Sequence, residues 1–298
     1  MRPLVSFITV NYNSLHDTLE FLLCCEKLTY KNIEVFVVDN ASKEDPRNEI
    51  MSPFPWVKYI RSEKNLGFAG GNNLAVRQAT GEYLFFLNND TLLFPDFLEK
   101  IVDFMQSHPD AGMASPKVLF GNGTTIQYAG TTGINFLGRG HRIGLHEEDH
   151  GQYDKTYKTV YGHGAALIVP RKVVAEVGEM PEEFFLYYEE HDWCERVKRH
   201  GYNMYYIGTS SILHKESMST GGDESYTKVY YLNRNRLLFM RRNFSGLKLA
   251  AGVLYFYIIS VPKNTLKYLF KGKIQLARGI LKGAIWNLTN SAYVDRSR

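Results

Sequence analysis

The sequence predicts an α/β fold: a mostly parallel sheet with helices on both faces, followed by a basic helical segment. Strand-like and helix-like segments alternate through the first 120 residues, which is typical of βαβ units. The strand-like segments are continuous apolar runs, as expected where both faces of a parallel sheet are covered. The 298 residues, 44% hydrophobic and 22% charged, suit one large globular domain or two small ones.

Each predicted element has a local signal. Residues 4–10 form a polar-bounded apolar run, glycines open the helix at 68–80, and a proline opens the helix at 95–108. The helix at 189–201 begins with acidic residues, ends with basic ones and stops at a glycine. The remaining predicted elements are strands at 33–39, 56–62, 82–88, 162–170 and 203–214, and a helix at 15–28.

The cysteines and the first residues indicate a cytoplasmic protein. Cys24, Cys25 and Cys194 are odd in number and form no C-x-x-C pair, which favours reduced thiols over a disulfide framework. The first apolar run has only seven residues, and no small-residue cleavage site follows. It is short for a signal peptide and fits a buried strand better.

The basic residues are concentrated near the C-terminus. Residues 225–294 contain twelve Lys or Arg and no Asp or Glu, whereas residues 1–224 contain 21 basic and 30 acidic residues. This asymmetry predicts an anionic surface as a partner, either membrane or nucleic acid. No RNA-binding module is recognisable in the sequence, so we expect a membrane surface and no nucleic acid.

Polar or glycine residues follow four consecutive predicted strands. Ligands of open α/β sheets bind beyond the carboxyl ends of the strands, so these residues predict one polar rim. Each group also has a simpler explanation as a turn, a helix cap or a helix-opening loop. No G-x-G-x-x-G follows the first strand, which disfavours NAD. The groups are 11–13 (NYN), 39–42 (DNAS), 64–73 (KNLGFAGGNN) and 88–90 (NND).

Asp90 is the sharpest candidate of this rim. A carboxylate at the end of a buried strand is costly unless it is paired, hydrogen-bonded or bound to a metal. Mg²⁺ takes few protein carboxylates and completes its shell with phosphate oxygens and water. Asp90 therefore predicts a metal and diphosphate site, and the alternative is a cap of the following helix.

Five segments in this order resemble family 2 glycosyltransferases of the GT-A fold, in the rhamnosyltransferase and galactofuranosyltransferase-like branch. They are FITVNYN, VVDNAS, NLGFAGGNN, GEYLFFLNND and FFLYYEEHDWCERVKRHGY, and the resemblance covers roughly residues 3–243. It implies an inverting hexosyl transfer from a dTDP- or UDP-sugar to a hydroxyl of a lipid-linked or polysaccharide acceptor in cell-envelope glycan synthesis. We accordingly expect a catalytic domain at 1–243 and a basic amphipathic tail at 244–298.

The resemblance also implies roles for individual residues. Asn11 and Tyr12 would line the base pocket, and Asp39 would bind the pyrimidine edge. Asp90 would bind the metal, Mn²⁺ or Mg²⁺, with His214; the alternative for His214 is a strand-end side chain bonded to backbone. Asn88 replaces the first acid of the metal motif, which leaves strict metal dependence open and weakly favours dTDP. The implied nucleotide-binding residues are Asn11, Tyr12, Asp39, Asn40, Asn65, Gly67, Gly70, Gly71, Asn88 and Asn89.

The acidic cluster at 189–192 is the candidate catalytic centre. Acids at a helix start complement the helix dipole, which is the structural alternative. Clustered carboxylates, however, raise the pKa of at least one member, which suits a general base. The resemblance assigns this role to Glu190, with Glu189 and Asp192 orienting the acceptor or positioning Glu190. The His-containing stretch 121–161 is expected to be an acceptor-site loop without a zinc signature.

The C-terminal segment is predicted to lie on a membrane surface. Residues 249–262 are uncharged but too few to span a bilayer, which takes about 20 residues. After Pro262, apolar and basic residues recur on separate stripes, as in interfacial amphipathic helices. The alternative is packing on the body or on a second subunit. The stripes are Leu266, Phe270, Ile274, Ala277, Leu281, Ile285 and Leu288, and Lys267, Lys271, Arg278 and Lys282.

Two other functions remain open from sequence. A nucleotidyltransferase uses a similar sheet but would need a glycine-rich basic loop after the first strand, where this chain has NYNSLHD. A non-catalytic scaffold binding membrane or RNA would leave the acidic cluster and Asp90 without a purpose. We therefore expect a glycosyltransferase that is peripheral on the inner face of the membrane.

Overall fold

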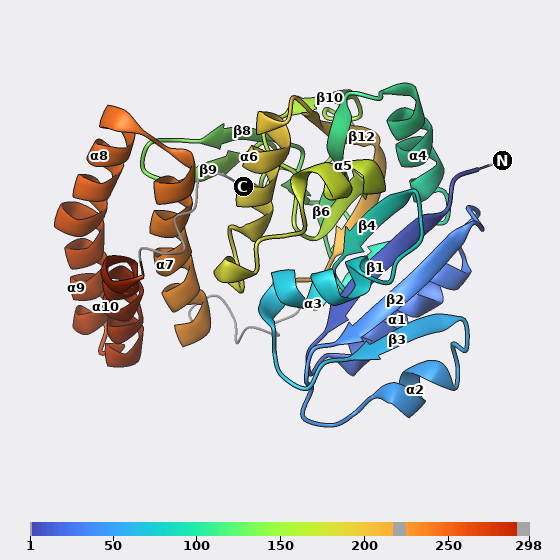
Figure 1. Ribbon diagram of the computed structural model, residues 1–298, viewed down its shortest axis with the longest axis horizontal. Coiled ribbons are helices and arrows are strands. Elements are labelled where there is room, and N and C mark those ends of the chain that lie inside the picture. The colour runs from blue at the N-terminus through green and yellow to red at the C-terminus, as the bar shows by residue number, and fades with distance from the viewer. Residues whose placement is uncertain (1, 217–224, 291–298) are drawn as a thin grey trace.

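A ten-stranded sheet forms the centre of the protein, and helices cover both of its faces (Figure 1). The computed structural model describes residues 2–216 and 225–290. The strands are β1 (Val5–Asn11), β2 (Ile33–Asp39), β3 (Val57–Arg61), β4 (Tyr83–Leu87), β5 (Thr91–Leu93), β6 (Ala111–Phe120), β7 (Ile126–Tyr128), β8 (Thr131–Ile134), β9 (Gly140–Arg142), β10 (Thr156–Thr159), β11 (Ala166–Pro170) and β12 (Asn203–His214). The α-helices are α1 (Leu15–Glu26), α2 (Arg47–Met51), α3 (Gly67–Val76), α4 (Phe97–Ser107), α5 (Arg171–Val177), α6 (Glu189–Arg199), α7 (Tyr226–Asn243), α8 (Gly246–Tyr255), α9 (Val261–Phe270) and α10 (Ile274–Thr289).

The strand order is β10-β12-β6-β11-β4-β1-β2-β3, with β5 paired to β12 and β7 paired to β6. Strands β4, β1, β2 and β3 are parallel, and so are β6 and β12. Strand β11 joins the two groups and runs antiparallel to both neighbours. The predicted mostly parallel α/β sheet is therefore confirmed. The carboxyl ends of β1 to β4 meet at one edge, where the polar residues lie.

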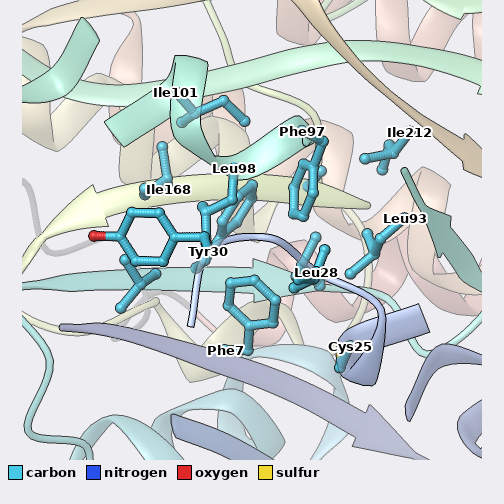
Figure 2. Packing of buried hydrophobic residues seen from close by; sticks show 14 of the residues in the cluster. Phe7, Cys25, Leu28, Tyr30, Leu93, Phe97, Leu98, Ile101, Ile168 and Ile212 are labelled. Carbon is cyan, nitrogen blue, oxygen red and sulfur yellow. The ribbon is translucent and has the colours of Figure 1, made fainter. Parts of the chain in front are cut away.

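Successive residues of the central strands face opposite cores. On one face, Phe7 packs against Phe85 and Phe97, with ring centroids 5.7 and 6.2 Å away, under α1 and α4 (Figure 2). On the other face, Phe86 packs edge-on against Trp193, with centroids 5.4 Å apart, under α3, α5 and α6. Burying each such side chain contributes about 1.5–3 kcal/mol. The two cores hold the sheet rigid behind its polar edge.

Strand β6 and strands β7 to β10 have no counterpart among the predicted elements. Pro116 lies within β6 and is paired with Ile207, next to an irregularity in the ladder of β12. A proline has no backbone N–H to donate to the ladder, so a proline in a sequence argues against a central strand. For this reason the sequence did not predict β6. The predicted strand 162–170 is also shorter than expected, because β11 begins at Ala166 and residues 162–165 form a loop.

Helices α7 to α10 lie side by side at one end of the molecule (Figure 1). α8, a π-helical turn (Phe256–Ser260) and α9 form one 25-residue helix from Gly246 to Phe270. The π turn directly precedes Pro262. Proline has no backbone N–H, and a π turn accommodates the missing helical hydrogen bond. This helix is long and apolar enough to cross a membrane by length and composition, with a mean hydropathy of 1.2. The expectation of a segment too short to span is therefore wrong, because the helix continues past both ends of 249–262.

The helix predicted after Pro262 is divided into α9 and α10. The break lies at Gly272, whose φ of +69° favours glycine. α10 packs on α7 through Ile280 and Ala284, which belong to the same core as Leu237. Asn287 Nδ2 also donates to the carbonyl of Arg234 at 2.9 Å. Part of the C-terminal segment is therefore packed on the body, as the structural alternative supposed.

Candidate active site

The ends of β1 and β2 join in a buried polar cluster. Asn11 and Asp39 are register partners, and Asn11 Nδ2 donates to Asp39 Oδ1 at 2.7 Å. Asp39 Oδ2 accepts from Ser42 N at 3.1 Å and from the Arg61 guanidinium at 2.6 Å. Asp39 is 0% exposed, so these bonds offset the cost of burying its charge. Arg61 was not predicted, and only its pairing with Asp39 across β2 and β3 identifies it.

Tyr12 lies at the surface of this cluster. Its neighbour Asn13 has a φ of +52°, and Asn13 N donates to Ser42 Oγ at 2.8 Å. The loops after β1 and β2 are thus joined, which accounts for Asn13 as a turn residue. Tyr12 itself is 38% exposed, and its implied place in the base pocket remains a prediction.

Asn40 and Asn65 connect the end of β2 to the start of α3. Asn40 Nδ2 donates to the carbonyl of Gly67 at 2.9 Å and to Asn65 Oδ1 at 3.2 Å. Asn40 Oδ1 accepts from Leu66 N at 2.9 Å, and Asn65 Oδ1 accepts from Gly67 N at 2.8 Å. These two amides fix the loop that precedes the helix.

The glycines of α3 are explained by close backbone packing. Gly67 has a φ of +72°, and a Cβ there would lie 2.1 Å from the carbonyl oxygen of Phe185. Phe68 N donates to the same oxygen at 2.6 Å. A Cβ at Gly71 would lie 3.1 Å from Val10, and one at Gly70 would lie 2.8 Å from Leu66. Their implied place under the ribose and diphosphate remains a prediction.

Asp90 and His214 form the candidate metal pair. Asp90 Oδ1 lies 3.2 Å from His214 Nε2, and Asn88 Nδ2 lies 3.3 Å from the same nitrogen. Asp90 and His214 are 7% and 8% exposed. Asn89 points elsewhere, because its Nδ2 donates to Thr18 Oγ1 at 2.9 Å and to the carbonyl of Ser14 at 3.2 Å. Asn89 therefore attaches this strand end to α1.

Gln127 on β7 orients the histidine and was not predicted. Its Oε1 lies 2.7 Å from His214 Nδ1, so Nδ1 donates and Nε2 is the ring nitrogen on the side of Asp90. A histidine ligand is usually oriented in this way by a second partner. One imidazole nitrogen and one carboxylate oxygen suit Mn²⁺, and Mg²⁺ to a lesser degree, with phosphate oxygens completing the shell. The residues present therefore fit a divalent metal.

A second group of acidic residues, on α1, is a weaker candidate for metal binding. Within the described part of the chain, His16, Asp17 and Glu20 are the one group of three ligand-type side chains close enough for a metal. The Lys215 ammonium forms ion pairs with both Asp17 and Glu20. The group is therefore neutralised by the residue that follows His214.

The loop before α6 has a strained backbone. Phe185, Tyr187 and Tyr188 have φ values of +65°, +69° and +74°, which cost roughly 1–3 kcal/mol each unless the surroundings impose them. Asn235 Nδ2 on α7 contacts the carbonyls of Phe184, Leu186 and Tyr187 at 2.7–2.8 Å. The Arg234 guanidinium donates to the carbonyls of residues 183 and 184. Sequence inspection missed both α7 residues, which hold the acidic residues in place.

Glu189 and Glu190 have opposite pKa shifts. Burial, followed by the charge of Glu190, raises the pKa of Glu189 well above its usual range. Burial also acts to raise the pKa of Glu190, but the charge and hydrogen bond of His191, with two backbone N–H groups, more than offset it and lower the pKa. His191 Nδ1 lies 3.1 Å from Glu190 Oε1, whereas Glu190 Oε2 has no hydrogen-bond partner. Glu190 is thus ionised at neutral pH with one oxygen unused.

The Asp192 carboxylate contacts the end of α7. It is 0% exposed, and its Oδ1 accepts from Arg242 Nε at 3.0 Å and from Asn243 Nδ2 at 2.7 Å. Asp192 therefore anchors α6 to the end of α7, and its implied role of orienting the acceptor or positioning Glu190 remains a prediction.

The loop 162–165 brings the two halves of the site together. The carbonyl of Ala165 accepts from Asn88 N at 3.0 Å, and the His163 ring lies 6.1 Å from the His214 ring. On its other side, a Cβ at Gly164 would lie 3.6 Å from Glu190 Oε1. The Asp90–His214 pair and Glu190 therefore lie on either side of one short loop. In the sequence, His163 belongs to a group of four histidines, with His141, His146 and His150, that was expected to lie in an acceptor-site loop.

Residues 6–178, more than half of the chain, match the family model described as Glycosyl transferase family 2. The protein belongs to glycosyltransferase family 2. Over 295 residues it is 26% identical to the low-salt glycan biosynthesis hexosyltransferase Agl10 of Haloferax volcanii, covering 96% of this chain and 91% of that one. It is 25% identical over 307 residues to the dTDP-rhamnosyl transferase RfbF of Shigella flexneri, covering 96% and 100%.

A third relative of this glycosyltransferase is the N-acetylglucosaminyl-diphospho-decaprenol L-rhamnosyltransferase of Mycobacterium tuberculosis, 22% identical over 249 residues, covering 75% and 80%. Among solved structures, the mannosyltransferase PcManGT of Pyrobaculum calidifontis, in complex with GDP-Man and Mn²⁺, aligns with a TM-score of 0.61 at 15% identity, covering 97% and 88%. S. aureus TarS 1–349 with UDP-GlcNAc aligns with a TM-score of 0.61 at 15% identity, covering 94% and 81%. The predicted family and the GT-A fold are therefore confirmed.

Proposed function

We propose that this glycosyltransferase transfers a sugar, with rhamnose the favoured candidate, from dTDP or UDP to an acceptor hydroxyl with inversion. The acceptor would be a lipid-linked or polysaccharide glycan of the cell envelope. The observation that carries the proposal is the position of Glu190 and the Asp90–His214 pair on either side of loop 162–165. Two relatives, a dTDP-rhamnosyl transferase and a decaprenol-linked L-rhamnosyltransferase, favour rhamnose.

The donor base would bind at the ends of β1 and β2. Tyr12 offers an exposed ring, and the Asp39 cluster with Asn11 and Arg61 offers the polar edge. Asp39 is itself enclosed by its partners, so its role is to fix Asn11, Ser42 and Arg61 as well as to accept from the base. An ionised acceptor of this kind discriminates pyrimidine from purine edges by hydrogen-bond pattern.

The transfer would proceed as a direct displacement. The acceptor oxygen attacks the anomeric carbon, the bond to the diphosphate breaks, and Glu190 Oε2 takes the acceptor proton. Glu190 suits this role because its lowered pKa keeps it ionised, its Oε2 has no hydrogen-bond partner, and its carboxyl group lies beside Gly164 through Oε1. Asp90 and His214 would hold the divalent metal, which when bound neutralises charge on the leaving diphosphate. Burial and the charge of Glu190 raise the pKa of Glu189, which favours its neutral form and so opposes a second negative charge beside the base.

The C-terminal helices would hold the enzyme on the inner face of the membrane. Their basic residues include Lys248, Lys263, Lys267, Arg278 and Lys282, and residues 225–294 contain no acid. Exposed apolar and basic residues together favour an anionic membrane surface. The residues 1–243 would form the catalytic domain and 244–298 the docking segment. The exposed large apolar residues of this segment are Leu247, Leu254, Ile258, Ile259, Leu266, Leu269, Phe270, Ile274, Leu281, Ile285 and Leu288.

The proposed donor class is tested by thermal shift with UDP, dTDP, GDP and ATP, with and without Mn²⁺, followed by a hydrolysis screen over nucleotide sugars. We expect stabilisation by UDP or dTDP and release of free sugar from one pyrimidine donor. Conversion of the nucleotide sugar and added pyrophosphate into a sugar 1-phosphate and a nucleoside triphosphate would instead indicate a nucleotidyltransferase. Absence of binding to every nucleotide would indicate a scaffold.

A further inference from the structure

A basic cavity lies between the acidic loop and the C-terminal helices. Its volume is about 290 Å³, and its lining includes Tyr188, Arg139, Lys228, Arg236 and Asn264. Three of these side chains are cationic, and none of the described residues that line it is acidic. A cavity of this size is at the lower end of ligand sites, which suits a headgroup better than a whole glycan.

Arg236 is the decisive residue of this cavity. It is 8% exposed, its Nε has no hydrogen-bond acceptor, and one terminal nitrogen donates to Ser260 Oγ at 2.6 Å. Its guanidinium also lies over the Phe256 ring, 4.8 Å from the centroid. In the described part of the chain Arg236 forms no ion pair with a carboxylate. By contrast, Arg242 on the same helix is paired with Asp192.

A buried cation without a counter-ion is costly. Burial lowers the pKa of Arg236, and the charge of Arg139 acts in the same direction, while Tyr188 acts against them. Folding alone gives no reason for two arginines to line one acid-free cavity. A bound anion supplies the missing counter-charge, and guanidinium groups match phosphate oxygens in geometry.

The cavity also connects the membrane-facing helices with the catalytic residues. Asn264 on α9 lines it, while Leu266, Leu269 and Phe270 of the same helix are exposed. On the opposite side, the Tyr188 ring lies 5.6 Å from the His191 ring, and His191 contacts Glu190. A headgroup in this cavity would therefore have lipid on one side and the proposed base on the other.

We infer that this cavity binds the diphosphate of a lipid-linked acceptor through Arg236 and Arg139. The inference rests on the proposed function, which supplies a lipid-linked acceptor. Arg236 would be a binding residue that holds the acceptor so that its sugar hydroxyl extends past Tyr188 toward Glu190.

The test measures binding to phosphatidylcholine vesicles that contain either a polyprenyl diphosphate or phosphatidylglycerol at equal surface charge. We expect the wild-type protein to prefer the diphosphate vesicles about tenfold or more, as for a charged hydrogen-bonded contact. Arg236→Gln should lose this preference and Arg236→Lys should retain part of it. Arg278→Gln, on the exposed side of α10, should weaken binding to both vesicle types equally. Soluble geranyl diphosphate in EDTA should abolish the wild-type preference.

An absent wild-type preference, or a preference that survives in Arg236→Gln, would overturn the inference. Equal competition by phosphatidylglycerol vesicles would also overturn it, because the cavity would then recognise bilayer phosphate. If Arg236→Gln does not fold, Arg139→Gln at the β8–β9 turn decides the outcome in the same way. Thermal shift with UDP and dTDP separates the two proposals: a protein that binds nucleotide without diphosphate preference contradicts this inference alone.

Discussion

His214 Nε2 lies 3.2 Å from Asp90 Oδ1 because the three-residue strand β5 pairs with the end of β12. Thr91, the residue after Asp90, is the register partner of His214. The candidate metal pair therefore depends on one short ladder, and Gln127 then fixes the ring of His214. Asp90 and His214 are far apart in the sequence, and the pairing of β5 with β12 brings them together as candidate metal ligands.

Removing either member of this pair should weaken metal binding. With only two protein ligands, Asp90→Asn should reduce Mn²⁺ affinity in the presence of UDP or dTDP by at least tenfold, and His214→Ala should do the same. Electron paramagnetic resonance of free Mn²⁺ measures this without turnover. Asp96→Asn, an exposed acid on the following turn, is the control. Unchanged Mn²⁺ binding, together with turnover that resists EDTA, would remove the metal from the mechanism.

Loss of Asp39 should reduce nucleotide affinity. Asp39→Ala removes the carboxylate that accepts from both Asn11 and Arg61, which costs about 1–3 kcal/mol. We expect a smaller thermal shift with UDP and dTDP, and Arg61→Ala should have a similar effect. Asp103→Ala on the exposed side of α4 should not change the shift. Equal stabilisation of the wild-type protein by GDP or ATP would contradict a pyrimidine site.

Glu190→Gln should slow transfer by about 10²–10⁴ while nucleotide binding stays nearly constant. Glu189→Gln should have a much smaller effect, because burial and the charge of Glu190 raise the pKa of Glu189 and favour the neutral carboxyl that glutamine resembles. Since the pKa of Glu190 is lowered, the rate should not fall on its account until the pH is below about 4.3, the usual glutamate value. Single-turnover rates against pH measure both effects. A full-rate Glu190→Gln variant would move the base to another residue.

Glu34 should stabilise the fold at neutral pH and lose this effect in acid. Burial acts to raise its pKa, but hydrogen bonds from Lys58, Ser6 and Thr80 more than offset it and lower the pKa to about 2. A carboxyl with a lowered folded-state pKa stabilises above its unfolded pKa, and the contribution disappears as pH falls from about 4.5 towards 2. Glu34→Gln should therefore lower the free energy of unfolding at pH 7 and flatten its decline below pH 4.5. Denaturant titrations across this range test it, and a parallel decline in both proteins would refute the assignment.

Exposed apolar side chains should control membrane binding independently of salt. Leu247 and Phe270 are 90% and 88% exposed, so Leu247→Ser with Phe270→Ser should weaken vesicle binding at both low and high salt. Lys263→Gln with Lys267→Gln should weaken it at low salt only, by about 1 kcal/mol per charge. Co-sedimentation measures both pairs, with Leu23→Ser on α1 as the control. If the wild-type protein stays in the supernatant with acidic vesicles, these helices do not bind membrane, and a subunit contact becomes the explanation for their exposed apolar residues.

Surface substitutions are preferable to removal of the C-terminal segment. Residues after 243 share a core with α7, and the Arg241 guanidinium donates to the carbonyl of Asn287. Truncation after Asn243 should therefore lower stability, in addition to any effect on membrane binding. A shifted thermal midpoint in the truncated protein would confirm this.

The local sequence predicted the candidate site residues better than the residues that hold them in position. Asp39 and Asp90 were identifiable because each ends a buried strand, and the helix beginning at Glu189 was identifiable from its acids. Arg61, Gln127 and Asn235 were not, since each acts on a residue that is distant along the chain. Their roles depend on strand pairing and helix packing, which a single sequence does not contain. Asp192 was grouped with Glu189 and Glu190 because it is close to them in sequence, but its side chain contacts α7 instead.

The C-terminal segment failed the prediction for a related reason. Its uncharged stretch has no local stop, so the helix continues through Lys248 and Lys263 to Phe270. Of the predicted apolar stripe, Ala277 is buried against α7 while most of the others are exposed. Helical spacing gives the stripe, but only the packed structure shows which side of it meets the body.

The contact between Gly67 and Phe185 limits how this enzyme can diversify. Both the carbonyl and the ring of Phe185 lie against Gly67, so any side chain at position 67 would change the spacing between the α3 end of the site and the acidic loop. We therefore expect related enzymes that use other sugars to keep the spacing between Gly67 and Phe185 and to differ in residues on the other side of the site. The exposed residues around the β8–β9 turn are free of that constraint, and inherited differences in substrate range should accumulate there.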